Sequence, residues 1–407
     1  MLTSDPFILD RRIYQQAYSL AKDGFFVEVV YTVPDLILPE PRHKNLKFTS
    51  KSLFKVNSAS SKLIWKWWRI VRDLGSHSIF LIRIYQFLIA KLKDTSKSWA
   101  NSLLEFDWPE VDLIVCHDVP LLETALRLKP VTNAKKVLLD AHEIFDAQYD
   151  AIYSNTSLNY WSRVCREFTP QADAVTTVTD LIALEMQKRF SLESRPVTVQ
   201  NSYPKYNYLP NIKKYQIHDL YNISKDKKVL LCMGEMRPGR NLEDLIQAMK
   251  HVEDENIVLV FLGFITEIYK HKLYEFISSN CIQNVYLGKH VAPECVVDYA
   301  CSANLGIVSN RGEGPNNTLG GPNRVYEYIQ ARLPVLAYDH QGIKQIVDEY
   351  GIGRVCRWKS PKELAILIED MIDLKLMIPE QLENAAESVC WESDYKNYKA
   401  VIETLLK

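Results

Sequence analysis

Residues 305–328 read Leu305-Gly306-Ile307-Val308-Ser309-Asn310-Arg311-Gly312-Glu313-Gly314-Pro315-Asn316-Asn317-Thr318-Leu319-Gly320-Gly321-Pro322-Asn323-Arg324-Val325-Tyr326-Glu327-Tyr328. The apolar run at 305–309 predicts a buried strand, and 322–332 predicts a helix that leads into a further strand at 334–338. Glycines let backbone N–H groups approach a ligand closely, and the start of the helix adds partial positive charge. This order of strand, glycine-rich loop and helix predicts a site for a diphosphate.

Strands and helices alternate outward from this stretch in both directions. In the second half we expect strands at 228–233, 257–262, 284–287, 305–309 and 334–338, with helices at 241–251, 268–279, 293–300 and 322–332. In the first half we expect strands at 26–31, 111–116, 136–139 and 174–178, with helices at 12–22 and 180–190. Short, apolar, β-branched strands of this kind are typical of a parallel sheet covered by helices on both faces. The sequence therefore predicts an α/β fold made of two doubly wound units.

The chain is long enough for two domains, and the periodic pattern weakens at 195–225. We expect an N-terminal domain at 1–200, a C-terminal domain at 201–380 and a final helical segment at 381–407. A helical insertion at about 57–105 interrupts the first domain. Within it, residues 62–92 include a basic, Trp-rich run, which is compatible with peripheral contact to an anionic membrane. The alternative is a helical pair packed over the first sheet.

The composition excludes several classes of protein. The formal net charge is −1, so nothing global indicates nucleic-acid binding. The eight cysteines are scattered singly with no CxxC pair, which argues against a zinc site or a disulfide framework and fits a reducing cytosol. No signal peptide and no uncharged apolar stretch of spanning length is visible. We expect the protein to be cytoplasmic, with binding at the inner face of the membrane as one alternative.

The run from Pro322 to Tyr328, followed by Leu333-Pro334-Val335, resembles the donor motif of family 4 glycosyltransferases, in the version found in surface-polysaccharide enzymes. The resemblance implies the GT-B fold, with two facing Rossmann-like domains and a cleft between them, and sugar transfer with retained configuration. In that motif Glu327 binds the nucleotide ribose, and Asn323 and Arg324 belong to the donor site. The usual partner glutamate, eight residues earlier, is Leu319 here. The resemblance then leaves the hexose contact to Glu313 or to backbone N–H groups of Leu319, Gly320 and Gly321.

A second part of the resemblance is Gly234-Glu235-Met236-Arg237-Pro238-Gly239-Arg240-Asn241-Leu242. The family places a basic residue here against the donor diphosphate, and Arg240 matches it best, with Arg237 as the alternative. An arginine can bind two phosphate oxygens at once and keeps its charge. Gly234 is included in the donor site, and backbone groups near Val291 are expected to contact the base. The competing interpretation pairs Arg240 with Glu243 or Asp244 on a helix surface.

Two segments of the first domain resemble acceptor-side signatures of the same branch, namely His117-Asp118 and Asp140-Ala141-His142-Glu143. Each follows an apolar strand, so both should lie at the carboxyl edge of the sheet, where open α/β folds bind ligands. Side chains that exchange protons at that edge indicate a site for an acceptor hydroxyl. The alternative is that Asp140 caps a helix and His142 only packs.

Together these observations predict a retaining transferase that moves a sugar from a nucleotide-diphosphate sugar to a glycan or lipid-linked acceptor in bacterial surface-polysaccharide synthesis. The residues expected to carry the reaction are His142, Arg240 and Glu327. No Asp-x-Asp motif is present, so we expect no metal and no cofactor besides the nucleotide-sugar substrate. Two alternatives remain: a GT-B nucleotide-sugar epimerase, and a non-catalytic scaffold subunit that binds partners through the Trp-rich run.

Overall fold

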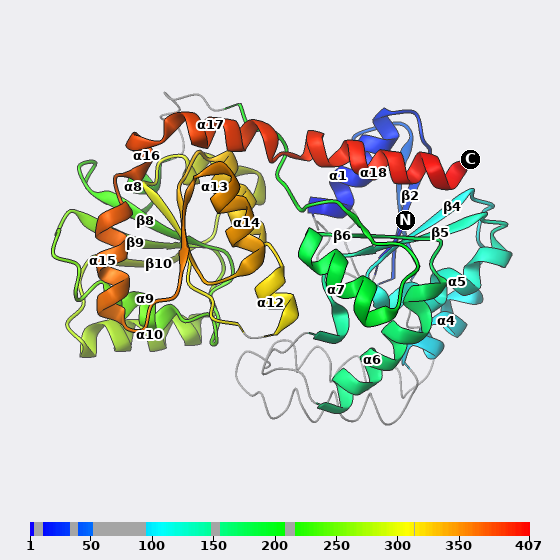
Figure 1. The fold of residues 1–407 in the computed structure, drawn as a ribbon, viewed down its shortest axis with the longest axis horizontal. Coiled ribbons are helices and arrows are strands. Elements are labelled where there is room, and N and C mark those ends of the chain that lie inside the picture. The colour runs from blue at the N-terminus through cyan, green and yellow to red at the C-terminus, as the bar shows by residue number, and fades with distance from the viewer. Residues whose placement is uncertain (4–10, 33–39, 52–94, 148–154, 208–215, 313) are drawn as a thin grey trace. The chain divides into compact units, whose positions relative to one another are not determined.

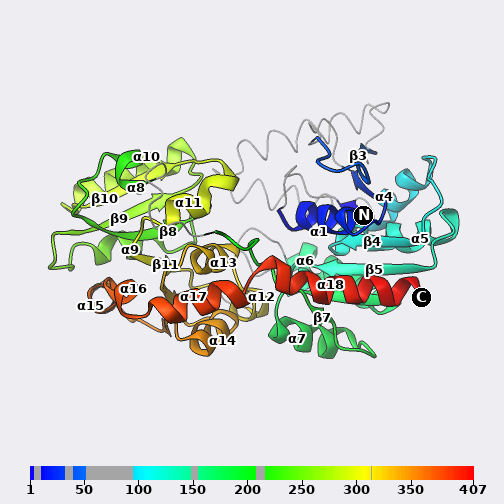
Figure 2. The same cartoon turned by 90° about the horizontal axis from the view of Figure 1, so that it is seen from above.

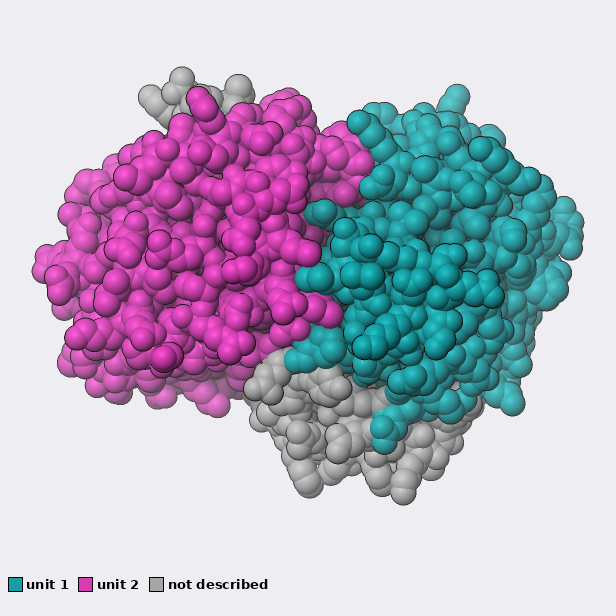
Figure 3. Space-filling model, in the orientation of Figure 1, with its two compact units in different colours: residues 1–200, 314–316, 395–407 teal, residues 201–313, 317–394 magenta. Residues whose placement is uncertain are grey.

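A computed structural model describes residues 1–3, 11–32, 40–51, 95–147, 155–207, 216–312 and 314–407. The chain divides into two compact units, coloured separately in Figure 3. Unit 1 contains residues 1–200, 314–316 and 395–407, and unit 2 contains residues 201–313 and 317–394. Each unit has its own parallel sheet (Figure 1).

The sheet of unit 1 has the strand order β3-β2-β1-β4-β5-β6-β7, and every strand pair is parallel. Its strands are β1 (Leu2–Thr3), β2 (Val27–Tyr31), β3 (Leu46–Ser50), β4 (Leu113–His117), β5 (Lys136–Ala141), β6 (Ala174–Thr177) and β7 (Val197–Thr198). Its main helices are α1 (Arg11–Lys22), α4 (Thr95–Leu104), α5 (Leu122–Val131), α6 (Asn155–Phe168) and α7 (Asp180–Phe190). Most of the C-terminal helix α18 (Trp391–Leu406) also belongs to this unit, where Lys399 pairs with Asp23 at 2.7 Å.

The sheet of unit 2 has the order β10-β9-β8-β11-β12-β13, and it is also parallel throughout. Its strands are β8 (Lys228–Met233), β9 (Ile257–Leu262), β10 (Val285–Lys289), β11 (Leu305–Val308), β12 (Val335–Tyr338) and β13 (Gly353–Cys356). Its helices are α8 (Ile217–Tyr221), α9 (Leu242–Ala248), α10 (Glu267–Ser279), α11 (Val296–Ala300), α12 (Pro315–Leu319), α13 (Asn323–Gln330), α14 (Gln341–Tyr350), α15 (Pro361–Met371), α16 (Leu374–Met377) and α17 (Pro379–Ser388).

Alternate residues of the central strands point to opposite faces, and both faces are buried. In β8, Val229, Leu231 and Met233 pack with α8, α11, α13, α14 and α17, whereas Leu230 and Cys232 pack with α9, α10 and α15. Figure 2 shows this sheet between its two layers of helices. Because both faces are covered, the strands are apolar throughout, which is the pattern that predicted them.

The order of strands in unit 2 reverses between β8 and β11, and Tyr328 of α13 lies at this point. Its buried hydroxyl donates to Leu231 O of β8 (2.9 Å), lies 3.3 Å from Ile307 O of β11 and accepts from Met233 N (3.1 Å). Gly306 makes room for the ring, because a Cβ there would lie 2.7 Å from Tyr328. One side chain therefore anchors α13 across the two strands that diverge at the switch point.

The predicted strands are confirmed, β8 and β9 with their predicted bounds. The helix expected at 241–251 is shorter, because Asn241 has a positive φ of 55° and α9 begins after it. Pro322 precedes α13 as its N-cap rather than lying in its first turn. The sequence did not predict the short edge strands β3, β7 and β13, nor helix α12 inside the glycine-rich loop.

The Trp-rich insertion falls largely outside the described residues, so the membrane contact predicted for residues 62–92 stays a prediction. Of the predicted helical insertion at 57–105, α4 is described. In the described part of the chain, no helix combines the length and apolar character needed to cross a bilayer. All eight cysteines are described, and all are free thiols.

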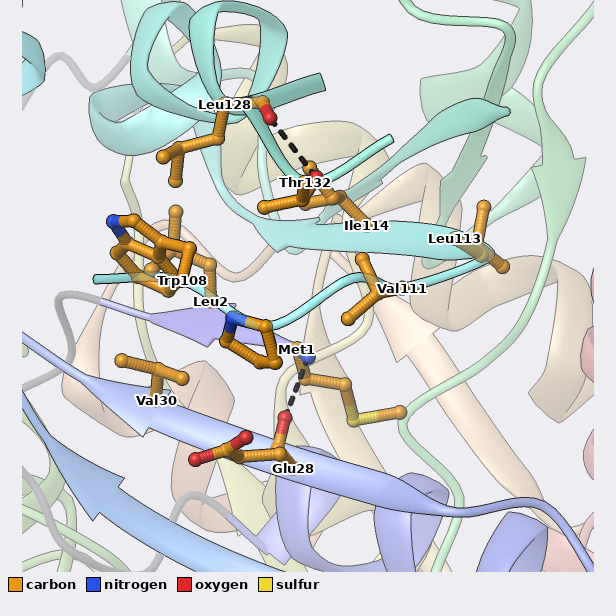
Figure 4. A pocket seen from close by; sticks show the side chains of 11 residues that line it. Met1, Leu2, Glu28, Val30, Trp108, Val111, Leu113, Ile114, Leu128 and Thr132 are labelled. Carbon is orange, nitrogen blue, oxygen red and sulfur yellow. Dashed lines mark hydrogen bonds between the residues drawn. The ribbon is translucent and has the colours of Figure 1, made fainter. Parts of the chain in front are cut away.

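A small apolar cavity of about 60 Å³ lies at the amino edge of the first sheet (Figure 4). Val111 and Leu113 line it at the start of β4, and Glu28 lines it at the start of β2. Ligands of open α/β sheets bind at the opposite, carboxyl edge. We therefore do not assign a functional site to this cavity.

Tyr328→Phe removes the hydroxyl and leaves buried backbone groups of β8 without their partner. We expect a loss of stability of about 1–3 kcal/mol, because an unsatisfied buried polar group retains its desolvation cost. Tyr274→Phe is the control in the same unit, since Tyr274 is 45% exposed. Thermal melting of both variants measures the difference; equal melting temperatures would refute the anchoring role of Tyr328.

Candidate functional site

The loops that follow β8 and β11 meet at the carboxyl edge of the second sheet. Ser309 Oγ donates to Arg240 O at 3.3 Å, which joins the loop after β11 to the loop after β8. Gly234 begins the first of these loops with a φ of 106°, a conformation that favours glycine. Doubly wound sheets bind ligands at such a switch point. The structure therefore places Gly234 and Arg240 in the loop at the switch point of this sheet.

Two arginines converge on the end of β8. A Cβ added to Gly234 would lie 3.7 Å from a guanidinium nitrogen of Arg324. Burial raises the pKa of the Cys232 thiol, while the charges of Arg324 and Arg240 act on the same thiol and lower its pKa. The charges of both guanidinium groups thus act at the end of β8, where Arg324 lies beside Gly234. Such a pair can bind an anion with two negative charges.

The acidic residues that could compete for Arg240 have other partners. Glu243 accepts a hydrogen bond from Tyr269 Oη at 2.7 Å, and Asp244 pairs with Arg311 at 3.2 Å. Arg237, the alternative phosphate ligand, pairs with Glu235 at 3.3 Å. These pairs weigh against the interpretation in which Arg240 serves only a surface ion pair on α9.

Helix α13 presents a polar face at its start. Asn323 is exposed and Glu327 is half-buried, whereas Arg324, Val325 and Tyr326 are buried. Residues four apart lie on the same side of a helix, so Asn323 and Glu327 share this face. Asn201 Nδ2 donates to Asn323 Oδ1. A ribose lying at this face could reach the Glu327 carboxylate.

The remaining donor-side predictions fall at the same edge of the sheet or outside the described residues. Leu319 ends α12, and Gly320 and Gly321 follow it directly. Val291 lies just beyond β10 and packs partly against the core. Glu313 is outside the described residues, so the structure says nothing about it as a hexose ligand.

In unit 1, the predicted acceptor-side residues form one cluster around Asp140. The register pairs His117 of β4 with Asp140 of β5. Asp140 Oδ2 lies 3.2 Å from His117 Nδ1 and 3.2 Å from His142 Nε2, and Asp118 Oδ2 lies 3.3 Å from His142 Nδ1. Strand β5 extends to Ala141, so Asp140 is a strand residue and not a helix cap.

Asp118 holds the cluster together through its backbone amide and its carboxylate. Its amide donates to Asp140 O at 3.0 Å, and its Oδ1 accepts from His142 N at 2.8 Å. Asp118 has a φ of 61°, which is uncommon for a residue with a side chain. Strained backbone of this kind is frequent at functional sites.

The cluster changes the acidity of its members. Burial and the charge of Arg12 lower the pKa of His142, but Asp118 and Asp140 outweigh them and raise it to about 9. Burial raises the pKa of Asp140, but hydrogen bonds from His117 and His142 hold it well below its usual value. Burial lowers the pKa of His117. His142 is therefore protonated at neutral pH, and both of its ring nitrogens face carboxylates.

Four residues that the sequence did not single out complete the surroundings of Asp140. Gln16 Nε2 donates to its Oδ2 at 2.9 Å, and Thr176 Oγ1 donates to its Oδ1 at 2.7 Å. Arg12, 4% exposed, is close enough to lower the pKa of His142 and Glu143, and the Asp140 charge reaches the buried Tyr398 of α18. Thr176 had a detectable signal in the sequence, because it lies near the end of β6, the strand next to β5. Gln16 and Tyr398 had none.

Glu143 lies at the exposed side of this cluster. Burial and the Asp118 charge raise its pKa to about 7, although Asn316 Nδ2 donates to its Oε2 at 2.9 Å. Asn316 groups with unit 1, and its Oδ1 also accepts from Ile144 N at 3.0 Å. A half-buried carboxyl that titrates near neutral pH is suited to exchange a proton with a substrate.

His117, Asp140 and His142 each present one nitrogen or oxygen atom within 4.8 Å of the others, as metal ligands would. Two imidazoles and a carboxylate suit a transition metal. Here, however, both oxygens of Asp140 already accept hydrogen bonds from protein donors, and Arg12 adds positive charge close to His142. Asp140 and His142 are therefore held by protein hydrogen bonds and charges. His117 only lies 3.2 Å from Asp140, and neither of its buried ring nitrogens has a hydrogen-bond partner among the described residues. We assign no metal to these three side chains.

The raised pKa of His142 predicts how stability depends on pH. Its contribution is fully present below the ordinary value of 6.5 and is lost as the pH rises through about 9. The loss should be on the order of 3 kcal/mol across this window. Thermal melting between pH 6.5 and 9 should show a decline in the wild type that His142→Gln lacks.

Glu143→Gln is the control for this experiment, because a carboxyl with a pKa raised from 4.5 to about 7 affects stability below pH 7. Above pH 7, the melting temperature of Glu143→Gln should decline as that of the wild type does. Parallel profiles for the wild type and His142→Gln would contradict the assignment.

Comparison with known proteins finds a family match within the second unit. Residues 214–389 match the family model "Glycosyl transferases group 1". A probable glycosyltransferase, WbjE of Pseudomonas aeruginosa, is 28% identical over 158 residues. That match covers 37% of this chain and 38% of WbjE, so it spans well under half of either protein.

Solved structures match nearly the whole chain at low identity. A sucrose-phosphate synthase from Thermosynechococcus elongatus has a TM-score of 0.67 at 14% identity, covering 97% of this chain and 92% of its own. HepE from Anabaena, in complex with UDP, has a TM-score of 0.66 at 12% identity, covering 99% and 98%. A glycosyltransferase from Rickettsia africae has a TM-score of 0.65 at 13% identity, covering 100% and 98%. The chain therefore has the GT-B fold of two Rossmann-like domains, and residues 214–389 match the glycosyl transferases group 1 model.

Proposed function

We propose that this protein is a retaining glycosyltransferase of family 4, which moves a sugar from a nucleotide-diphosphate sugar to a glycan or lipid-linked acceptor in bacterial surface-polysaccharide synthesis. The observation that carries the proposal is the position of two arginines at the switch point of the unit that matches the family model: the Arg324 guanidinium lies beside Gly234 at the end of β8, and Arg240 lies in the loop after β8, where Ser309 binds its carbonyl. The structure of HepE in complex with UDP and glucose supports a nucleotide sugar as the ligand class.

In this proposal, unit 2 binds the donor. Arg240, Arg324 and the start of α13 stabilise the negative charge that grows on the diphosphate as the glycosidic bond breaks. The transition state resembles an oxocarbenium ion, and the departing phosphate takes the proton of the acceptor hydroxyl. Glu327 holds the ribose. Backbone N–H groups near Leu319 replace the glutamate that the motif usually carries there.

Unit 1 binds the acceptor through the cluster around Asp140. Because both ring nitrogens of His142 face carboxylates, we assign it a positive charge and a hydrogen-bonding role rather than that of a base. Glu143 and Asp118 are more exposed and are the carboxylates available to an acceptor hydroxyl.

Arg240→Ala should weaken binding of a nucleoside diphosphate by about 100-fold, because it removes charge-assisted hydrogen bonds to phosphate. Glu327→Ala should instead weaken binding of the nucleoside part and reduce the preference for ribose over 2′-deoxyribose. Isothermal titration calorimetry with diphosphates, monophosphates and their deoxy forms separates the two effects. Arg237→Ala is the control, and a loss confined to that variant would show that the phosphate ligand is Arg237.

Treatment with EDTA should leave transfer unchanged, since the proposed charge stabilisation comes from arginines and a helix and not from a metal ion. Activity is compared before and after dialysis against EDTA, and again after adding Mg²⁺ or Mn²⁺. Loss on dialysis with recovery on addition would show that a divalent ion takes part.

A further inference from the structure

Helix α14 begins beneath the last residues of the glycine-rich loop, and its first residues touch that loop closely. A Cβ added to Gly342 would lie 2.3 Å from Leu319 O and 2.4 Å from Gly320 O. Such distances do not occur between real atoms, and backbone atoms cannot rotate away as a side chain can. Only glycine fits at this position while residues 317–321 keep their path.

The same distances show which way the loop peptides face. The Leu319 carbonyl carbon lies 2.7 Å from that Cβ position, farther than its oxygen, so the carbonyl points toward α14. In a trans peptide, the N–H of the next residue points the opposite way. The described residues contain no cis peptide bond. The N–H groups of Gly320 and Gly321 therefore face away from α14.

His340, the residue before α14, binds the chain where it enters the glycine-rich loop. It is 4% exposed, and its Nε2 lies 2.6 Å from Asn310 O. A carbonyl can only accept, so Nε2 carries the proton. Burial lowers the pKa of His340, and the backbones of Asn310 and Asn317 oppose that shift. Asn310 lies just before the glycine-rich loop, so this hydrogen bond fixes the start of the loop.

Arg324 connects this support to the proposed donor site. Its charge acts on His340, and its guanidinium also lies against Gly234 and near Cys232. A change in the position of His340 or of residues 317–321 would therefore affect Arg324, which lies where the diphosphate is proposed to bind.

We propose that His340 and Gly342 are positioning residues that hold residues 317–321 in the conformation that binds a nucleoside diphosphate. The inference rests on the proposed function. His340 secures the loop by its hydrogen bond to Asn310, and Gly342 permits the close approach that turns the Gly320 and Gly321 amides outward. Neither residue needs to touch the ligand.

The first test compares two glycine variants with the same kind of steric conflict. Gly342→Ala should raise the Kd for a nucleoside diphosphate by about 10- to 100-fold, because small displacements of positioning groups have effects of this size. Gly353→Ala is the matched control, since its Cβ would lie 2.0 Å from Val335 O at the far edge of the sheet. It should lose stability and keep its affinity.

The second test uses His340 and does not depend on whether Gly342→Ala folds. His340→Leu removes the donor to Asn310 O and should raise the Kd by about 10-fold. His340→Gln places an amide N–H near the same point and should recover most of that affinity. A merely structural role would lower the melting temperature of both variants without this difference in binding.

Both tests use whichever of UDP, GDP, ADP, CDP and dTDP binds the wild-type chain, with affinity measured by titration calorimetry and folding by circular dichroism. Wild-type affinity in folded Gly342→Ala and His340→Leu would overturn the inference and leave the proposed function standing. If the wild type binds none of the five diphosphates, the proposed function fails, and this inference fails with it.

Discussion

The hydroxyl of Tyr328 is the contact on which the second unit depends. It reaches the backbone of β8 and of β11 where the pairing of these two strands ends. The hydroxyl forms hydrogen bonds with backbone groups that the pairing of the two strands does not satisfy. Since Tyr328 belongs to α13, the same contact sets the position of Glu327, Arg324 and the start of the helix relative to the sheet.

The two units use charge in different ways. At the end of β8, two arginines lie close to a buried thiol, and the acids nearest in sequence to Arg240 are engaged with Tyr269 and Arg311. That arrangement suits an anionic ligand. Around Asp140, cations and anions alternate and largely satisfy one another, with Glu143 and Asp118 at the accessible side. That arrangement suits a neutral hydroxyl group, which needs directional hydrogen bonds more than net charge.

At position 319, where the motif usually carries a glutamate, the structure shows how the backbone is oriented. Leu319 and Gly320 direct their carbonyl groups to the N-terminal end of α14, so the amides that follow face the other way. A site built from backbone N–H groups depends on the path of the chain rather than on one side chain. This makes the residues beneath the loop as relevant to the proposed donor site as the residues in it.

The sequence by itself determined the two parallel sheets, because strands buried on both faces must be apolar throughout. It also placed His117, Asp118 and Asp140 directly at or after such strands, and Arg240 in the loop that follows another. It also located the glycine-rich loop and α13. It could not show edge strands such as β13, which carry too little apolar signal, nor α12, where Pro315 starts a short helix among loop residues. Only the tertiary structure showed that Gln16, Thr176 and Tyr398 surround Asp140, that Tyr328 spans β8 and β11, and that Gly342 supports Leu319. These contacts join residues far apart in the chain, and their geometry arises from packing, which local sequence patterns do not record.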